Sequence, residues 1–123
     1  MERGDQARVL LIVEDRADVG TAFVRYFRRH FDAVLLAATP EEAEAFLQAN
    51  PTPTHVICDH WLGEGHPVGT VLLPRWRIRY PNLRRCVIVS GSEIEEIRLP
   101  PGVDAVFAKP ADMPAIRASL LVA

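Results

Sequence analysis

Short apolar runs alternate along the chain with segments in which apolar residues recur every three or four positions. The apolar runs lie at residues 8–13, 33–37, 54–59, 85–89 and 104–108, and they predict five β-strands. The other segments predict helices near residues 18–31, between Thr39 and Pro51, near 68–80, near 92–98 and from about residue 112 onward. This alternation is typical of a parallel sheet with helices on both faces. Five β/α units account for the 123 residues, so we expect a single domain, residues 1–123, without an output domain.

Local signals set the boundaries of two of these helices. Thr39 suits a helix N-cap, Pro40 suits the first helical position, and Glu42 completes a capping box. The run Pro100-Pro101-Gly102 stops a helix because proline cannot continue the backbone hydrogen bonds. We therefore expect the fourth helix to be shortened to roughly two turns.

The composition, with 49% apolar and 24% charged residues, is that of a globular protein. A formal net charge of −2 argues against a basic surface that coats nucleic acid, so we expect no direct nucleic-acid contact. The sequence has no apolar run near the roughly 18 residues of a membrane span and no signal-peptide pattern. Cys58 and Cys86 lie inside apolar runs, as buried free thiols do. We expect a cytoplasmic protein without membrane contact.

Arginine is concentrated in one stretch of the sequence. No Asp or Glu lies between Gly65 and Ser92, and this stretch contains Arg75, Arg77, Arg79, Arg84 and Arg85. The favoured interpretation is a solvated helix face, because cations are favourable near a helix C-terminus. The alternative is a docking surface for an acidic partner.

Polar residues follow the predicted strands at the positions where functional sites form in parallel sheets. Lys109, the only lysine beside thirteen arginines, follows the fifth strand. Glu14 and Asp15 follow the first strand, Asp59 ends the third, and Ser90 follows the fourth. Sites in open parallel sheets form beyond the carboxyl ends of the strands. We expect these five residues to converge in one crevice.

These residue types suit a particular chemistry. Three carboxylates in one crevice repel one another, and a hard divalent cation such as Mg²⁺ removes that repulsion. A carboxylate beside Mg²⁺ can attack a phosphoryl group and become an aspartyl phosphate. The cation and a lysine then neutralise charge on the transferring oxygens, while a hydroxyl donates a hydrogen bond to one of them. The residues therefore indicate phosphoryl transfer to an aspartate, with Mg²⁺ as cofactor.

In the order and spacing of Glu14-Asp15, Asp59, Ser90 and Lys109-Pro110, the chain resembles the response-regulator receiver family over essentially its whole length. The resemblance implies an α/β, flavodoxin-like, doubly wound sheet of five parallel strands in the order 2-1-3-4-5. It implies that Asp59 accepts a phosphoryl group from a histidine kinase or a histidine phosphotransfer domain of a two-component phosphorelay, which then switches partner binding. Such a protein is a signalling module and no enzyme beyond its own phosphorylation and dephosphorylation.

The resemblance also implies how the metal is held. Asp15, Asp59 and the backbone carbonyl of Trp61 would ligate Mg²⁺, and Glu14 would act largely through a water. Trp61 occupies a position that flanks the approach of the phosphoryl group in the family. Its indole would shield the acyl phosphate from water.

Signal output is implied only in part. By resemblance, Ser90 is the switch hydroxyl that moves toward the phosphoryl oxygens, and Lys109 pairs with them. The family usually has a switch aromatic three residues before the lysine, but here that position is Val106 and the aromatic is Phe107. Alternation along a strand points Phe107 the opposite way, toward the core. We expect output without an aromatic switch.

Three alternatives share the receiver fold. The chain could act as a phosphate sink or relay without output, be a receiver cut from a hybrid kinase, or serve as an unphosphorylated pseudo-receiver scaffold. The downstream partner is an unidentified protein, and self-association into a homodimer stays open.

Alternatives from other classes fit less well. Phosphatase-like hydrolases have a DxDx[TV] pattern after the first strand, which residues 14–18 do not match. A dinucleotide fingerprint is suggested by the GxGxxxG spacing of Gly63, Gly65 and Gly69. No acidic residue follows about twenty positions later, so these glycines are expected to shape a loop. His60 and His66 lack a third soft ligand for a transition-metal site with Asp59.

Overall fold

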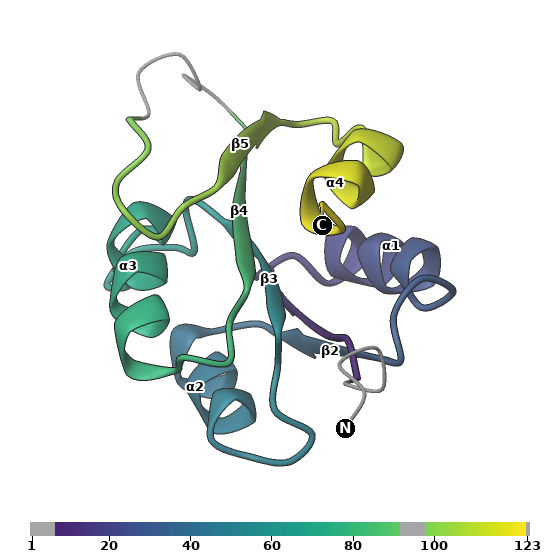
Figure 1. Cartoon of the computed structure of the whole chain (residues 1–123). Coiled ribbons are helices and arrows are strands. Elements are labelled where there is room, and N and C mark those ends of the chain that lie inside the picture. Colours follow the sequence, from purple (N-terminus) through teal and green to yellow (C-terminus); the bar gives the residue numbers. More distant parts are fainter. Residues whose placement is uncertain (1–6, 92–97, 123) are drawn as a thin grey trace.

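The structure, a computed structural model, describes residues 7–91 and 98–122 and contains one sheet with helices on both faces (Figure 1). Five parallel strands pair in the order β2-β1-β3-β4-β5. The strands are β1 (Val9–Val13), β2 (Ala33–Ala37), β3 (His55–Asp59), β4 (Arg85–Ser90) and β5 (Ala105–Ala108). The helices in the described ranges are α1 (Ala17–Phe27), α2 (Pro40–Leu47), α3 (Gly69–Arg79) and α4 (Met113–Leu120). The predicted flavodoxin-like class and strand order are confirmed.

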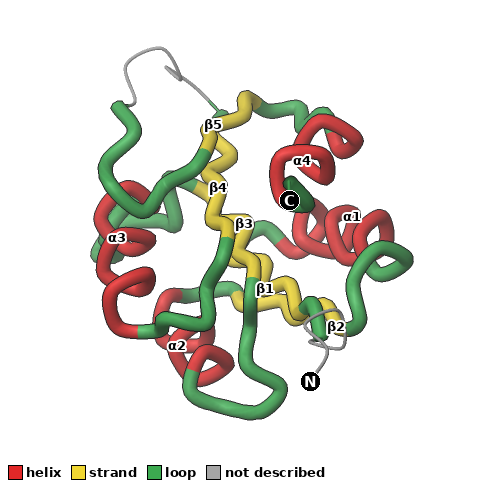
Figure 2. Tube along the Cα trace, viewed as in Figure 1, coloured by secondary structure: helices red, strands yellow, loops and turns green. Residues whose placement is uncertain are grey.

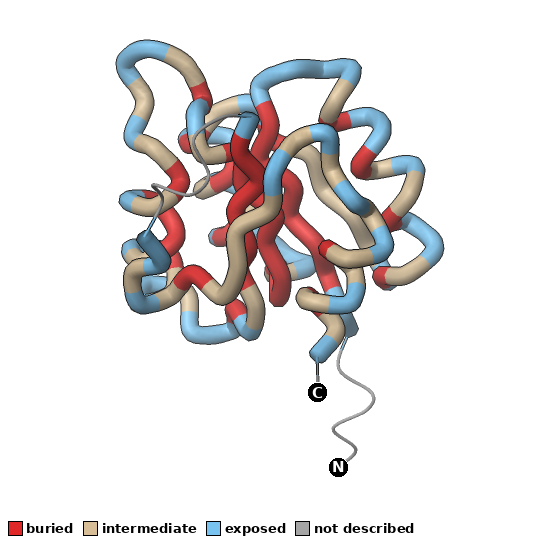
Figure 3. Tube along the Cα trace, turned by 90° about the horizontal axis from the view of Figure 1, so that it is seen from above, coloured by how far each residue is buried: buried red, intermediate tan, exposed pale blue. Residues whose placement is uncertain are grey.

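The sheet separates two apolar layers. Helices α1 and α4 cover one face, and α2 and α3 cover the other (Figure 1). Successive strand residues point to opposite faces, so Leu10 and Ile12 of β1 pack under α1 and α4, while Leu11 and Val13 pack under α2 and α3. All residues of β1 and β3 are buried, and Figure 3 shows the buried residues gathered in the middle of the molecule. Side chains of these two strands can therefore reach the surface only beyond the strand ends.

Side chains cap the N-termini of two helices, α2 and α4, which Figure 2 shows in red. The Glu42 N–H donates to Thr39 Oγ1 at 3.1 Å, and the Glu42 carboxylate accepts from the Ala38 N–H at 2.8 Å. At the start of α4, Asp112 Oδ1 accepts from the Ala115 N–H at 3.1 Å. Both helix starts agree with the sequence prediction. Within residues 7–91 and 98–122, no helix combines the length and apolar composition that crossing a membrane requires.

Helix α1 is shorter than predicted. It ends at Phe27, and a turn follows in which the His30 N–H donates to the Phe27 carbonyl at 2.8 Å. The Asp32 N–H then donates to the Arg8 carbonyl at 2.8 Å and leads the chain into β2. Phe31 is buried although it lies beyond the helix, so its apolar spacing extended the predicted helix too far. The short helix predicted at 92–98 falls at residues 92–97 outside the described part of the chain.

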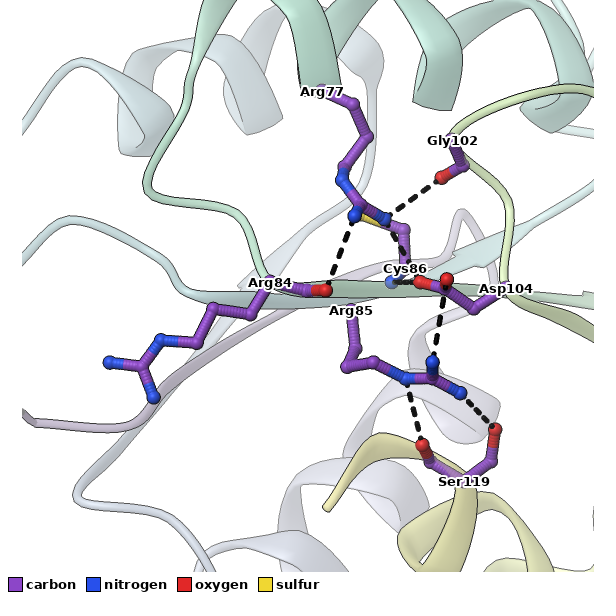
Figure 4. A network of polar contacts seen from close by, with 7 residues as sticks. All are labelled: Arg77, Arg84, Arg85, Cys86, Gly102, Asp104 and Ser119. Carbon is purple, nitrogen blue, oxygen red and sulfur yellow. Dashed lines mark hydrogen bonds and ion pairs between the residues drawn. The ribbon is translucent and has the colours of Figure 1, made fainter. Parts of the chain in front are cut away.

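A polar network fastens the start of β5 to its surroundings (Figure 4). The Asp104 carboxylate accepts from the Cys86 backbone N–H at 2.8 Å and from Arg77 Nη1 at 2.9 Å. Arg85 Nη1 lies 3.5 Å from the same carboxylate, and Arg85 Nε donates to the Ser119 carbonyl at 3.0 Å. One carboxylate thus ties α3, β4 and, through Arg85, α4 to the start of β5, the strand that Lys109 follows.

Candidate functional site

The polar residues that end neighbouring strands meet at one edge of the sheet. The strand order places β1, β3, β4 and β5 side by side, and parallel strands end at the same edge. Glu14 and Asp15 follow β1, Asp59 ends β3, Ser90 ends β4, and Lys109 follows β5. The structure therefore brings the carboxylates of Glu14, Asp15 and Asp59 together with the Lys109 ammonium at this edge. The backbone of Ser90 lies beside that of Lys109, and the roles of all five residues stay predictions.

Glu14 forms the buried floor of the site. It is 3% exposed, and its N–H donates to the Ala37 carbonyl at 2.9 Å. One carboxylate oxygen, Oε2, accepts from the Arg16 N–H at 3.2 Å. The other, Oε1, lies 3.1 Å from Lys109 Nζ. Both oxygens of Glu14 are thus fixed by neighbours, and its orientation in the crevice is set.

Lys109 bridges two carboxylates. Its ammonium lies 3.1 Å from Glu14 Oε1 and 3.3 Å from Asp59 Oδ2. Its backbone N–H donates to the Ser90 carbonyl at 2.9 Å, which fixes the lysine to β4, and the Lys109–Pro110 peptide bond is cis. A compact ammonium on a flexible stem suits such a double contact better than a guanidinium fork does. The contact with Glu14 was not predicted from the sequence.

Burial and charge shift the pKa values of this pair. Burial and, after it, the charge of Asp59 raise the pKa of Glu14 from 4.5 to about 7, against the opposing effects of Lys109 and of the Arg16 N–H. Burial alone would lower the pKa of Lys109, but its hydrogen bond with Glu14 and the charge of Asp59 outweigh it and hold the pKa above its ordinary value. Lys109 is therefore a permanent cation, but three carboxylates surround this one ammonium, and their excess favours a further positive charge.

The carboxylates fit a hard divalent cation. Glu14, Asp15 and Asp59 each offer an oxygen, and these oxygens lie within 4.8 Å of one another. Carboxylate oxygens in this number and spacing are the ligands that Mg²⁺ or Ca²⁺ uses in proteins. In the described ranges, no comparable cluster includes His60 or His66, so the transition-metal alternative finds no support.

The loop between β3 and α3 is shaped by glycines. Gly63 and Gly65 adopt φ values of +105° and +85°, which favour glycine. The Gly69 N–H donates to the His60 carbonyl at 2.9 Å, and a Cβ on Gly69 would lie 3.2 Å from the Asp59 carbonyl oxygen. The start of α3 can therefore approach the end of β3 closely, which agrees with the loop-shaping interpretation.

Trp61 lies two positions beyond Asp59 and is 58% exposed. Its neighbour Leu62 is buried in the apolar layer under α2 and α3 and anchors this part of the loop. The indole is thus available at the surface beside the end of β3. The proposed role of the Trp61 carbonyl as a metal ligand stays a prediction.

Val106 and Phe107 point to opposite faces of the sheet, as strand alternation predicted. Val106 packs against the apolar layer under α2 and α3, and Phe107 packs against the layer under α1 and α4. Both side chains are half-buried. The aromatic ring therefore lies on the other face from the position that a switch aromatic would take.

Comparisons with known proteins find a likeness in fold. No family model matches the sequence, and no curated protein matches it. A response regulator receiver domain protein from Methanospirillum hungatei superposes with a TM-score of 0.75 at 23% identity, over 90% of this chain and 88% of that chain. A response regulator receiver protein from Sinorhizobium medicae gives a TM-score of 0.78 at 19% identity, over 94% and 92%. The chain has the receiver fold.

A third structure with the receiver fold carries ligands. It is a response regulator protein from Burkholderia pseudomallei that contains a phosphorylated aspartic acid, a calcium ion and citrate. Its TM-score is 0.74 at 22% identity, over 94% of this chain and 67% of that chain. At these identities the likeness establishes the fold alone.

Proposed function

We propose that the chain is the phosphoacceptor receiver of a two-component phosphorelay and that Asp59 carries the phosphoryl group. The observation that supports this most is the contact of Lys109 with both Glu14 and Asp59, at the carboxyl edge of a receiver fold. A cation is thereby held beside the carboxylate that would be phosphorylated. A pseudo-receiver scaffold has no need of this arrangement.

Mg²⁺ would be held by the carboxylates of Asp15 and Asp59 and the carbonyl of Trp61, with Glu14 acting largely through a water. The phosphorylated relative from Burkholderia, with its calcium ion, supports a divalent cation in such a fold. When bound, Mg²⁺ supplies positive charge that neutralises the oxygens of the transferring group. The chain's own contribution is to keep three carboxylate oxygens within 4.8 Å of one another.

The reaction that we propose is transfer from a phosphohistidine. An Asp59 carboxylate oxygen forms a bond to phosphorus, the bond from phosphorus to the imidazole nitrogen breaks, and its electron pair stays on that nitrogen, which takes up a proton. Lys109 Nζ, now 3.3 Å from Asp59 Oδ2, would move onto an oxygen of the transferred group while remaining near Glu14. The Ser90 hydroxyl would donate a hydrogen bond to another of these oxygens.

The proposed phosphodonor is a histidine kinase or a histidine phosphotransfer domain, and the proposed output is a change in binding to a downstream protein. Phosphorylation replaces the single negative charge of Asp59 by a phosphoryl group with about 1.5 to 2 negative charges, and it adds several strong acceptors beside Ser90 and Lys109. We place the reaction in the cytoplasm, because Cys58 and Cys86 are buried free thiols of the kind that a reducing compartment maintains.

The test uses phosphoramidate, a small donor whose P–N bond resembles that of phosphohistidine. With Mg²⁺ present, phosphorus NMR of the protein should show an acyl-phosphate resonance that hydroxylamine removes. Chelation of Mg²⁺ should prevent its formation. A resonance that resists hydroxylamine, or none at all, would contradict the proposal.

A phosphate sink without output is a second candidate, which Val106 favours. A β-branched aliphatic side chain at this position cannot rotate between buried and exposed states as an aromatic ring would. In a sink, phosphate returns rapidly from Asp59 to a donor histidine. Rapid reverse transfer to a histidine phosphotransfer domain would support the sink, and slow reverse transfer would support a receiver with output.

A further inference from the structure

Helix α3 has an outward face that is both apolar and basic. Val71, Arg75, Ile78 and Arg79 recur at positions i, i+4, i+7 and i+8, so they share one side of the helix. All four are exposed, and Ile78, at 86%, is the most exposed large apolar residue in the described part of the chain. This face takes no part in the apolar layer that α3 covers, so it is free for a contact outside the chain.

The two arginines of this face have no carboxylate partner. In the described part of the chain, neither Arg75 nor Arg79 forms an ion pair. Arg79 instead donates from Nε to the Tyr80 hydroxyl at 3.0 Å, and its guanidinium carbon lies 5.5 Å from the centroid of the Tyr80 ring. Like charges four positions apart on a helix repel, and α3 contains no acidic residue to offset them. The face therefore favours a negatively charged neighbour.

Helix α2 lies beside α3 and has the opposite charge (Figure 1). Its eight residues include three glutamates and no arginine or lysine. Glu44 and Gln48 face α3, because Trp76 Nε1 donates to Glu44 Oε2 at 3.1 Å and Gln48 Nε2 donates to the Tyr80 hydroxyl at 3.3 Å. Glu41, one turn before Glu44, is exposed and forms no ion pair with any described residue. An acidic strip on α2 (Glu41 and Glu44) thus lies beside a basic strip on α3 (Arg75 and Arg79).

The two strips are not neutralised within the chain. A hollow of about 450 Å³ lies between the helices, with Glu44 and Gln48 on one side and Arg75 and Arg79 on the other. Glu44 and Arg75 line this hollow together, yet no ion pair between them is present in the described ranges. Charges of both signs are therefore available to a molecule that covers α2 and α3 at once.

We propose that this face binds a second copy of the chain, related by a two-fold axis that runs along α2 and α3 between them. Such an axis brings α2 of each copy against α3 of the other, so that the acidic strip meets the basic strip twice. Arg75 then pairs with Glu41 of the second copy, and Val71 and Ile78 are removed from water. This inference goes beyond the proposed phosphorelay function and does not depend on phosphorylation of Asp59.

The charge pattern favours a second copy over other occupants. A partner that fits both helices needs a basic strip and an acidic strip in the opposite order, and a copy turned about the two-fold axis presents that order. A membrane surface attracts clusters of roughly four to eight basic residues, whereas this face has Arg75 and Arg79 beside three glutamates. The glutamates likewise repel nucleic acid. An unrelated acidic protein would match α3 and be repelled by α2.

The apolar and charged residues have different roles in this contact. Val71 and Ile78 supply apolar area, and the two strips fix how the copies are oriented. Because exposed ion pairs contribute little and the apolar area is small, we expect a weak dimer with a Kd of roughly 0.1 mM.

The test is sedimentation equilibrium of the unphosphorylated protein from about 10 µM to about 1 mM, a range that brackets the expected Kd. The average mass should rise from that of a monomer toward that of a dimer. Amide resonances of ¹⁵N-labelled protein should shift with concentration on α2 and α3 and stay unchanged on α1 and α4.

Charge exchange then tests the pairing. Arg75→Glu should weaken association by roughly a hundredfold, because the two-fold axis repeats each substitution and each repeat costs about tenfold. Adding Glu41→Arg to Arg75→Glu exchanges the two charges and should restore association. Arg25→Glu, at an exposed position of α1, makes the same change in net charge and should leave the Kd unchanged. Ile78→Asn should weaken association by roughly tenfold through the loss of apolar area.

Four results would overturn the proposal. One is a monomer at every concentration, which would leave this face to an unrelated acidic protein. Another is a dimer whose resonance shifts lie outside α2 and α3. The third is a dimer that Arg75→Glu weakens no more than Arg25→Glu does. The last is a double variant, Glu41→Arg with Arg75→Glu, that associates no better than Arg75→Glu alone.

Discussion

The Lys109 ammonium lies 3.1 Å from the Glu14 carboxylate, across 95 positions of sequence. The same ammonium lies 3.3 Å from Asp59, so it links the ends of β1, β3 and β5. Glu14 is the more buried of the two acids and is fixed by the Arg16 N–H. Glu14 therefore positions the lysine, and Asp59 keeps an oxygen that can react. This division of roles underlies the predictions for the crevice.

Replacing Lys109 by methionine should slow phosphorylation by a small phosphodonor by about a hundredfold, because the charge beside the transferring oxygens is lost. The measurement is the initial rate of adduct formation at saturating Mg²⁺. Lys109→Arg is the matched variant, because it keeps the positive charge but not the compact shape of the ammonium. Its rate should fall between those of Lys109→Met and wild type. Equal rates for Lys109→Met and wild type would show that the ammonium does not contact the transferring group.

Replacing Trp61 by asparagine should shorten the lifetime of the phosphorylated protein several-fold, because the indole that shields the acyl phosphate is removed. The decay of the phosphorylated form is followed after the phosphodonor is exhausted. Ile78→Asn is the control, since Ile78 is also a large exposed apolar residue, 86% exposed, but lies on α3. If phosphorylated Trp61→Asn decays as slowly as phosphorylated wild type, the indole does not shield the acyl phosphate.

Stability should depend on pH through His55. Burial and the charges of nearby arginines lower its pKa from 6.5 to about 4 in the folded chain, so the unfolded chain binds the proton more readily. The contribution of His55 is therefore complete above pH 6.5 and is lost as the pH falls to about 4, which lowers the free energy of unfolding by about 3 kcal/mol. Urea unfolding between these pH values measures it. His55→Gln should reduce the slope of stability against pH, and an unchanged slope would contradict the prediction.

Replacing Asp104 by asparagine should lower the free energy of unfolding by about 2 kcal/mol, because Arg77 and Arg85 lose their shared carboxylate while the Cys86 N–H keeps an acceptor. Chemical denaturation measures the change. Asp18→Asn is the control, because the pair of Asp18 with Arg16 is solvent-exposed, and such pairs contribute little. If both variants unfold alike, Asp104 does not hold the start of β5.

The sheet could be predicted from sequence because each strand is a short apolar run between helical segments. Burial of β1 and β3 on both faces explains why their runs are continuous. The same apolar signal misplaced the end of α1, because Phe31 is buried in a turn and so looks like a further helical position. Apolar spacing indicates which residues are buried. It indicates a helix only where the backbone remains helical.

The contacts within the crevice could be predicted less fully. The strand ends brought Glu14 and Lys109 to the same edge, but their direct contact depends on the reach of a flexible side chain. The network of Asp104 had no sequence signal, since its partners Cys86 and Arg77 lie 18 and 27 positions away. The role of Asp104 depends on the packing of α3 and β4 beside β5, which the sequence alone does not show.

The most direct test of the receiver function is the intact mass of the protein after incubation with a small phosphodonor and Mg²⁺. Wild type should gain a single phosphoryl group, Asp59→Asn should gain none, and the exposed-site control Asp18→Asn should behave as wild type. A wild-type protein that gains no phosphoryl group, or an Asp59→Asn variant that still does, would contradict the assignment of Asp59 as the phosphoacceptor.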